Sequence, residues 1–78
     1  MTYSPAARPS QTARSILATK LRKLRAQRGW SQEDLAAESG LDRSFVAHVE
    51  REARNVSIDN IERLSIALGV QVFELLQP

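Results

Sequence analysis

Three glycines punctuate this 78-residue chain, and each follows a short segment whose apolar residues recur at helical spacing. Before Gly29, leucines stand at positions 17, 21 and 24, which places them on one face of a helix. Glycine takes the left-handed conformation that ends many helices at little steric cost. No segment shows the alternation of apolar and polar residues that is typical of a strand. The sequence therefore predicts an all-α domain of short helices.

Capping residues indicate where the helices begin. Ser31, Asp42 and Ser57 each stand directly before a helical segment, where a short polar side chain can accept a hydrogen bond from a free backbone N–H. The predicted helices run from about Ser10 to Arg28, from Ser31 to about Ser39, from Asp42 to about Arg51 and from Ser57 to Gly69, with a short fifth helix in Val70–Leu76. About three residues, a glycine among them, join the second helix to the third, which is typical of a helix-turn-helix motif.

The first ten residues have a different character from the rest. They contain prolines and small polar residues without an apolar period, so we expect a flexible arm over residues 1–10 and a single domain over residues 11–78. A domain of this size buries only about 60% of the surface that its unfolded chain exposes. A deep substrate pocket would therefore use up the core, and we expect the function to lie on the surface.

Several classes of protein are excluded by composition. The chain has no cysteine and one histidine, His48, so a disulfide framework, a thiolate metal site and a cysteine nucleophile are ruled out. It also has no glycine-rich phosphate loop and no paired nucleophile and base. No apolar run approaches the roughly 20 residues that span a bilayer, and there is no signal peptide. We therefore expect a cytoplasmic protein that is not an enzyme and binds no metal or cofactor.

The charge is unevenly distributed along the chain. The formal net charge is +2, but residues 1–30 carry seven basic residues and no acid, whereas residues 31–78 carry four arginines and nine acids. The two parts thus hold +7 and −5. Such asymmetry favours an anionic partner such as nucleic acid. The alternative is a basic helix that lies against an acidic body with its charges solvated.

The pattern resembles a known family of DNA-binding proteins. Its matching residues, in chain order, are Leu24-Arg25, Gly29, Ser31-Gln32, Leu35-Ala36, Gly40-Leu41, Val46 and Val49-Glu50. These are similar to the helix-turn-helix of the lambda- and 434-repressor-like (Cro/repressor, or XRE) proteins. The resemblance covers about residues 15–76 and implies a compact five-helix DNA-binding domain with the motif at its second and third helices. Residues 41–46, 50–51 and 54–55 are closest in pattern to controller proteins of restriction–modification systems.

The resemblance implies that the third helix reads bases in the major groove. Its exposed face would carry the candidate base-contacting residues Arg43, Ser44, Ala47 and His48. Arg43 is the strongest candidate, because a guanidinium can bond both O6 and N7 of guanine. The alternative for Arg43 is an exposed helix residue paired with Glu50 or with a neighbouring acid.

Other residues are expected to contact the DNA backbone or to hold the motif together. The candidate backbone contacts are Ser31, Gln32, Lys23, Arg28, Arg51, Arg54 and Asn55. Arg25 matches a family arginine that pairs with the glutamate aligned to Glu50, which implies a structural ion pair between the first and third helices. Many relatives carry glycine where this chain has Glu52, so we expect the loop that leads to Arg54 and Asn55 to follow a different path.

The end of the chain is rich in apolar residues, and relatives use this region to form a twofold dimer. The candidate dimer residues are Val70, Val72, Phe73 and Leu76. We expect some of them to cap the core and others, Val70 and Leu76 foremost, to form the dimer contact. A dimer would place two reading helices one turn of DNA, about 34 Å, apart. The alternative is that all four close the core of a monomer.

The sequence thus predicts a transcription regulator that binds an inverted-repeat operator as a homodimer, with the controller proteins nearest in pattern. An antitoxin of a toxin–antitoxin pair is the alternative within the same family. Membrane binding by the basic first helix is a further alternative, although its apolar face is expected to be committed to the core. No contact with a toxin or with RNA polymerase is predicted from particular residues.

Overall fold

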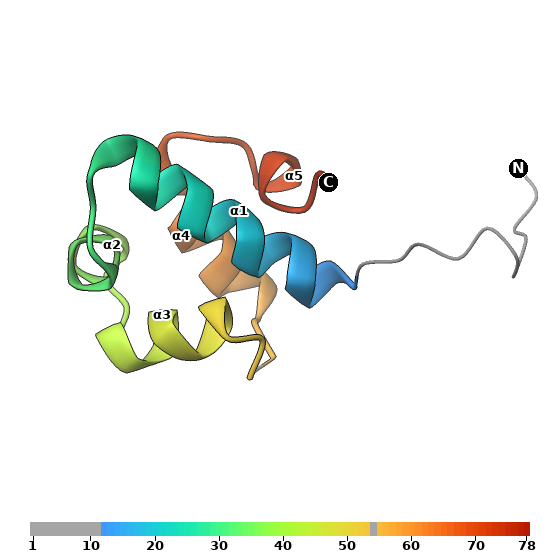
Figure 1. The fold of residues 1–78 in the computed structure, drawn as a ribbon, viewed down its shortest axis with the longest axis horizontal. Helices are drawn as coiled ribbons and strands as arrows, with labels where there is room; N and C mark the ends of the chain where they lie inside the picture. Colours follow the sequence, from blue (N-terminus) through green and yellow to red (C-terminus); the bar gives the residue numbers. More distant parts are fainter. Residues whose placement is uncertain (1–11, 54) are drawn as a thin grey trace, which may run out of the picture.

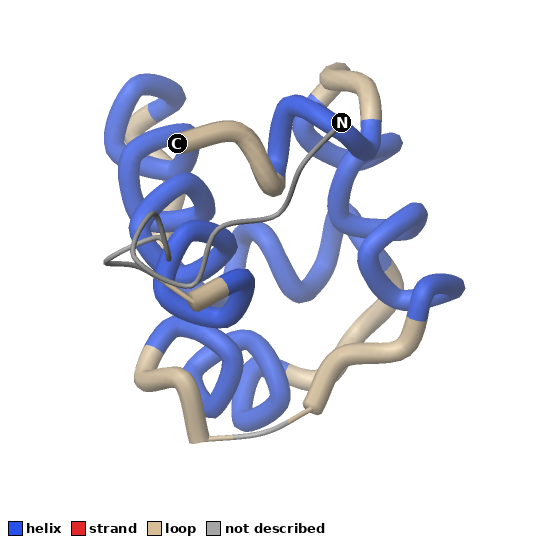
Figure 2. The backbone as a smooth tube through the Cα atoms, turned by 90° about the vertical axis from the view of Figure 1, so that its right-hand side faces the viewer, coloured by secondary structure: helices blue, strands red, loops and turns tan. Residues whose placement is uncertain are grey.

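The protein is described by a computed structural model that covers residues 12–53 and 55–78. Five helices make up its secondary structure: α1 (Ala13–Arg28), α2 (Gln32–Ser39), α3 (Arg43–Glu50), α4 (Ile58–Leu68) and α5 (Val72–Leu75) (Figure 1). Short loops join them, and these residues include no strand (Figure 2). The predicted all-α class and the five-helix architecture are confirmed. The predicted arm over residues 1–10 lies outside the described residues.

Three of the helices begin at side chains that cap them. The Oγ1 atom of Thr12 accepts a hydrogen bond from the Ser15 N–H, so α1 begins at Ala13 rather than near Ser10 as predicted. At α2, the Ser31 hydroxyl and the Asp34 carboxylate accept each other's backbone N–H groups at 3.0 and 2.8 Å. These reciprocal hydrogen bonds give acceptors to two backbone N–H groups that would otherwise lack partners at the start of the helix.

The start of α3 differs from this pattern. Asp42 occupies the N-cap position as predicted, but its side chain makes no capping hydrogen bond. The α4 start follows the rule again, because the Ser57 hydroxyl accepts from the Asn60 N–H at 3.1 Å. The recognition helix of the motif thus begins without the side-chain cap that stabilises its neighbours.

The end of α3 closes like the glycine-terminated helices. Glu52 has φ 60°, close to the left-handed values of the three glycines that follow the other long helices. Its N–H donates to the Val49 carbonyl and the Ala53 N–H to the His48 carbonyl, at 3.0 and 2.9 Å, which is the Schellman pattern. The glutamate thus adopts the conformation for which glycine is suited. Arg54, to which the expected change of path leads, lies outside the described residues.

The core lies where α1, α2, α3 and α4 meet. Helix α1 packs against α3 and α5, while α2 packs against α3 and α4. The apolar side chains that these helices bury are Leu17, Leu21, Leu35, Ala36, Val46, Val49, Ile61, Leu64, Leu68 and, from α5, Leu75. Burying each larger one contributes about 1.5–3 kcal/mol, so the core fixes the positions of the two motif helices.

No helix in the described ranges, 12–53 and 55–78, has the length and apolar character needed to cross a membrane.

Candidate nucleic-acid interface

A tight turn sets the angle between α2 and α3. Gly40 has φ 72°, and the N–H of the next residue, Leu41, donates to the Ala36 carbonyl at 3.0 Å. Val46 and Val49 then bury the inner face of α3 in the core. On the outer face of α3, Arg43 and Ser44 remain exposed. Helix α3 lies at the edge of the domain (Figure 1).

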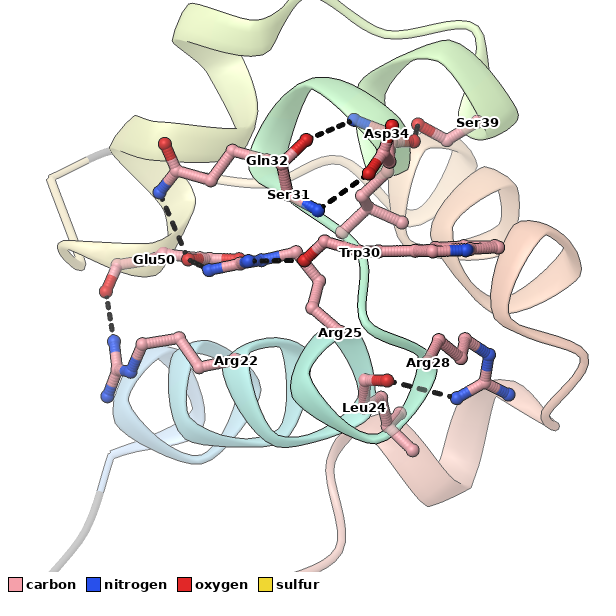
Figure 3. A network of polar contacts seen from close by, with 11 residues as sticks. Arg22, Leu24, Arg25, Arg28, Trp30, Ser31, Gln32, Asp34, Ser39 and Glu50 are labelled. Atoms are coloured by element: carbon pink, nitrogen blue, oxygen red, sulfur yellow. Dashed lines mark hydrogen bonds and ion pairs between the residues drawn. The ribbon is translucent and has the colours of Figure 1, made fainter.

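Arg25 of α1 forms a buried ion pair with Glu50, the last residue of α3. Its Nε and Nη2 atoms donate to the two carboxylate oxygens at 2.7 and 2.8 Å, and its Nη1 donates to the Trp30 carbonyl at 2.8 Å (Figure 3). The hydrogen bond to Glu50 raises the pKa of Arg25, partial burial opposes this, and the attraction of the Glu50 charge adds to it. The pair ties α1, the α1–α2 connection and α3 together.

Gln32 joins the same network from α2. Its Nε2 atom donates to Oε1 of Glu50 at 3.1 Å, so one carboxylate receives donors from two helices (Figure 3). Every buried side-chain nitrogen or oxygen within the described ranges has a hydrogen-bond partner, as a polar network in a core requires. Gln32 keeps its amide oxygen and a second amide hydrogen, and Ser31 keeps its hydroxyl hydrogen. Both predicted backbone contacts therefore retain groups that a phosphate or bridging water could engage.

The four predicted base-contacting residues lie on α3 but differ in exposure. Arg43 and Ser44 are exposed, whereas Ala47 and His48 are half-buried. The Arg43 Nε atom lies 3.9 Å from Oε1 of Glu33 on α2, and the Arg43 side chain is 61% exposed. Glu33, not Glu50, is thus the acid beside Arg43. An exposed pair of this length contributes little to stability, and it leaves the guanidinium accessible.

The loop after α3 carries the next group of predicted contacts. Arg51 and Asn55 are exposed there, while Arg54 lies outside the described residues. The Oδ1 atom of Asn55 accepts a hydrogen bond from Arg14, and the carbonyl of Glu50 accepts one from Arg22. Sequence analysis did not single out these two α1 arginines. The available signal was their spacing, since residues 14 and 22 flank Ala18 on the helix face that the structure turns toward α3.

Lys23 and Arg28 are not brought to this loop. Lys23 borders a shallow hollow with Gln77 and Pro78 near the end of the chain. Arg28 donates to the carbonyls of Leu24 and, across the molecule, of Leu68 at the end of α4. Its guanidinium also stacks over the Trp30 ring at 5.8 Å from the centroid. The structure therefore separates these two from the other predicted backbone contacts, and Arg28 links the end of α1 to the end of α4 by a hydrogen bond.

The predicted dimer residues divide into two groups. Val70 and Val72 are half-buried against the core, whereas Phe73 and Leu76 are exposed. Phe73 is 67% exposed, and Ile66 on α4, which sequence analysis did not select, is 72% exposed. Large apolar side chains in such positions favour an association surface. Its centre would be Phe73 rather than Val70.

Within residues 12–53 and 55–78, no three histidine, cysteine, aspartate or glutamate side chains gather as a metal site would require.

Comparison with known proteins finds relatives of this chain. Residues 21–75 match the Helix-turn-helix family. The chain is 47% identical over 68 residues to a hypothetical transcription factor from Neisseria meningitidis serogroup B, covering 87% of this chain and 64% of the relative. The chain thus spans less than two thirds of that relative's length. A crystal structure of a Neisseria transcription factor superposes with a TM-score of 0.85 at 43% identity, over 99% of this chain and 88% of the other.

Two restriction–modification controller proteins also match. The crystal structure of C.AhdI from Aeromonas hydrophila gives a TM-score of 0.76 at 50% identity and covers 80% of this chain and 94% of C.AhdI. A structure of the C.Esp1396I tetramer in complex with its natural 35-base-pair operator gives 0.76 at 34% identity, over 86% and 92% of the two chains.

Proposed function

Because the chain belongs to the helix-turn-helix family, we propose that it is a sequence-specific, DNA-binding transcription regulator that reads its operator through α3. The observation that carries the proposal is the network around Glu50. Donors from α1 and α2 meet on this α3 residue, while the outer face of α3 stays accessible. A helix fixed in this way keeps one orientation when it enters a major groove, as recognition of a base pattern requires.

Base reading is assigned to the N-terminal part of α3. Arg43 and Ser44 are exposed in its first turn, the part of a recognition helix that reaches base edges. Pairing with Glu33 involves the Nε side of Arg43 and leaves its Nη atoms for O6 and N7 of guanine. Such a bidentate contact contributes about 1–3 kcal/mol of discrimination against other bases. Ala47 and His48 lie further along the same helix and contribute at the groove's edge.

Backbone contacts are assigned to the two ends of the motif. Ser31, Gln32 and the free N–H groups at the start of α2 face one phosphate strand, because helix starts attract anions. Arg51 and Asn55 provide donors beyond the end of α3. These contacts position the protein but carry no sequence information, and they make the affinity depend on salt.

The working unit is assigned as a homodimer on an inverted repeat. Phe73 and Leu76 present apolar surface that a second copy would bury. C.AhdI and C.Esp1396I are controller proteins, and the latter has been described on its operator as a tetramer. Their similarity favours control of a restriction–modification system over the antitoxin alternative. The proposed role requires no catalysis and is exercised in the cytoplasm.

Selection from a random DNA pool tests the function. The full chain would be used to enrich bound duplexes, and its Kd for the enriched sequence would be compared with that for a scrambled duplex at about 0.15 M salt. We expect an inverted repeat and a preference of at least about 10³-fold, the lower end for specific DNA-binding proteins. Equal affinity for both duplexes would exclude a sequence-specific regulator.

A further inference from the structure

We infer that Arg14 and Arg22 of α1 are phosphate-binding residues, which extend the proposed DNA interface from the loop after α3 onto the side of α1. The inference rests on the proposed function and adds a binding surface to it. Both side chains project from α1 to the loop that follows α3, where Arg22 donates to the Glu50 carbonyl and Arg14 to Oδ1 of Asn55.

The partners of these arginines leave their charge available. Arg22 donates to a backbone carbonyl and Arg14 to a side-chain amide, both of which are neutral acceptors. The Glu50 carboxylate, the acid nearest to this contact along the chain, is already paired with Arg25. Neither Arg14 nor Arg22 forms an ion pair within the described ranges. Each therefore carries a positive charge that is not paired with a carboxylate in the described ranges.

Their donor groups are also largely free. An arginine carries five N–H donors in a rigid fork, and each of these side chains uses one in its contact with the loop. Both side chains are exposed. Holding one edge of the guanidinium reduces the rotamer freedom that phosphate binding would otherwise remove. Each guanidinium is therefore already held at the loop before a phosphate binds.

Arg14 and Arg22 lie beside the residues that are proposed to contact the DNA backbone. Arg51 and Asn55 lie on the loop that Arg14 and Arg22 contact, and Oδ1 of Asn55 is the atom that Arg14 engages, so the Asn55 NH₂ group remains to donate. Residues 14 and 22 are separated by about 12 Å along α1 at 1.5 Å per residue. A DNA strand carries a phosphate about every 3.4 Å of helix axis, so the pair can contact different phosphates.

A purely structural role is the competing explanation. The last carbonyls of a helix carry partial negative charge, and Arg22 at the Glu50 carbonyl would stabilise the end of α3 without any DNA. That role predicts a loss of thermal stability alone. Phosphate binding predicts a change in the salt dependence of DNA affinity, because each neutralised phosphate releases condensed counterions.

The test measures log Kd against log salt for the full chain and the variants R14Q, R22Q and K20Q, with both the enriched and a scrambled duplex. Lys20 is the matched control, because it lies on α1 between Arg14 and Arg22 yet borders the hollow near Gln77 and Pro78. We expect R14Q and R22Q each to reduce the slope by about 0.9 on both duplexes, and K20Q to leave it unchanged. The R22K variant keeps the charge and should keep the wild-type slope.

Contrary outcomes separate this inference from the proposed function. Wild-type slopes in R14Q and R22Q, with or without a lower Tm, would overturn the phosphate assignment while sequence-specific binding stood. An equal loss in K20Q would also overturn it, since the effect would then reflect net charge rather than position. Absence of any preference for the enriched duplex in the wild-type protein would instead exclude the proposed function itself.

Discussion

The guanidinium of Arg25 meets the carboxylate of Glu50 edge to edge, with Nε 2.7 Å from Oε2 and Nη2 2.8 Å from Oε1. The two side chains are only 18% and 3% exposed, so water screens the pair poorly. Gln32 completes the arrangement by donating to the same carboxylate. The Glu50 carboxylate therefore connects α3 to α1 and α2, in addition to the packing of the apolar core.

Removal of that carboxylate should be costly. In Glu50→Ala, Arg25 would be left partly buried without its counter-charge, and Gln32 would lose its acceptor. We expect the free energy of unfolding to fall by about 3–5 kcal/mol, as for other buried pairs broken on one side. Urea denaturation followed by circular dichroism measures this change.

The control for this substitution is Glu62→Ala on the exposed side of α4, which should change stability by less than about 0.5 kcal/mol. The double variant Arg25→Met/Glu50→Leu removes both charges, so it should be more stable than Glu50→Ala alone. The importance given to the pair would be refuted by equal costs for Glu50→Ala and Glu62→Ala.

Glu52→Gly should stabilise the domain. Glu52 holds φ 60°, a conformation that costs a residue with a Cβ atom about 1–2 kcal/mol. Glycine avoids this cost, although it gives the unfolded chain more freedom. We expect a net gain of about 1 kcal/mol and a rise in Tm of roughly 4–8 °C for a domain of this size. Scanning calorimetry would record it. Glu52→Ala keeps a Cβ atom and should show no such gain, so equal Tm values for the two variants would contradict the prediction.

Arg43→Ala and Arg51→Ala should affect DNA binding differently. Loss of the base contact made by the Arg43 guanidinium should reduce the preference for the enriched duplex by about 1–3 kcal/mol, or roughly 5- to 150-fold. Loss of a phosphate contact at Arg51 should weaken binding to enriched and scrambled duplexes alike and lower the salt slope by about 1. Fluorescence anisotropy at several salt concentrations distinguishes the two. If both variants lowered both affinities equally, the assignment of base reading to Arg43 would be wrong.

Phe73→Ser should weaken self-association without unfolding the monomer. The Phe73 side chain is 67% exposed, so its replacement removes little from the core of one chain. Sedimentation equilibrium should show a shift from dimer toward monomer, and the apparent affinity for an inverted repeat should fall with it. Ile58→Ser provides the control, because Ile58 is also largely exposed, at 72%, but lies at the start of α4, whereas α5, which carries Phe73, follows the end of α4. A dimer in Phe73→Ser as strong as in wild type would locate the contact elsewhere.

The helix boundaries could be predicted closely, because they depend mainly on residues next to them in the sequence, namely capping residues and glycines. Ser31 and Ser57 cap helices where their positions indicated, and glycines follow the ends of α1, α2 and α4. The start of α1 was misplaced by about three residues because Ser10 and Thr12 are both capping residue types, and it is Thr12 that accepts the hydrogen bond from the Ser15 N–H. Glu52 broke the rule that links a residue's type to its φ, since two backbone hydrogen bonds impose the conformation there.

The candidate interface was harder to predict than the helices, because its composition depends on where long charged side chains reach in the folded protein. Lys23 and Arg28 were selected for their charge, yet α1 turns Lys23 toward the chain end, and Arg28 crosses to the Leu68 carbonyl. Arg14 and Arg22 carry the same charge, but their relevance depends on where the loop after α3 lies. That position is set by tertiary packing, which charge and spacing alone do not specify. Glu33 was missed for the same reason, because its proximity to Arg43 arises only when α2 and α3 are packed.

The way in which four of the helices end affects how the proposed operator DNA would have to fit the protein. Left-handed residues at 29, 40, 52 and 69 end four helices within short loops, and the Glu50 carboxylate anchors three helices together. Helices held in this way cannot shift far to fit a major groove whose width or direction differs from the optimal one. The duplex must then supply the adjustment by bending or by changing groove width, at an elastic cost that depends on its own base steps. Base pairs that the protein never touches would thus contribute to the choice of operator.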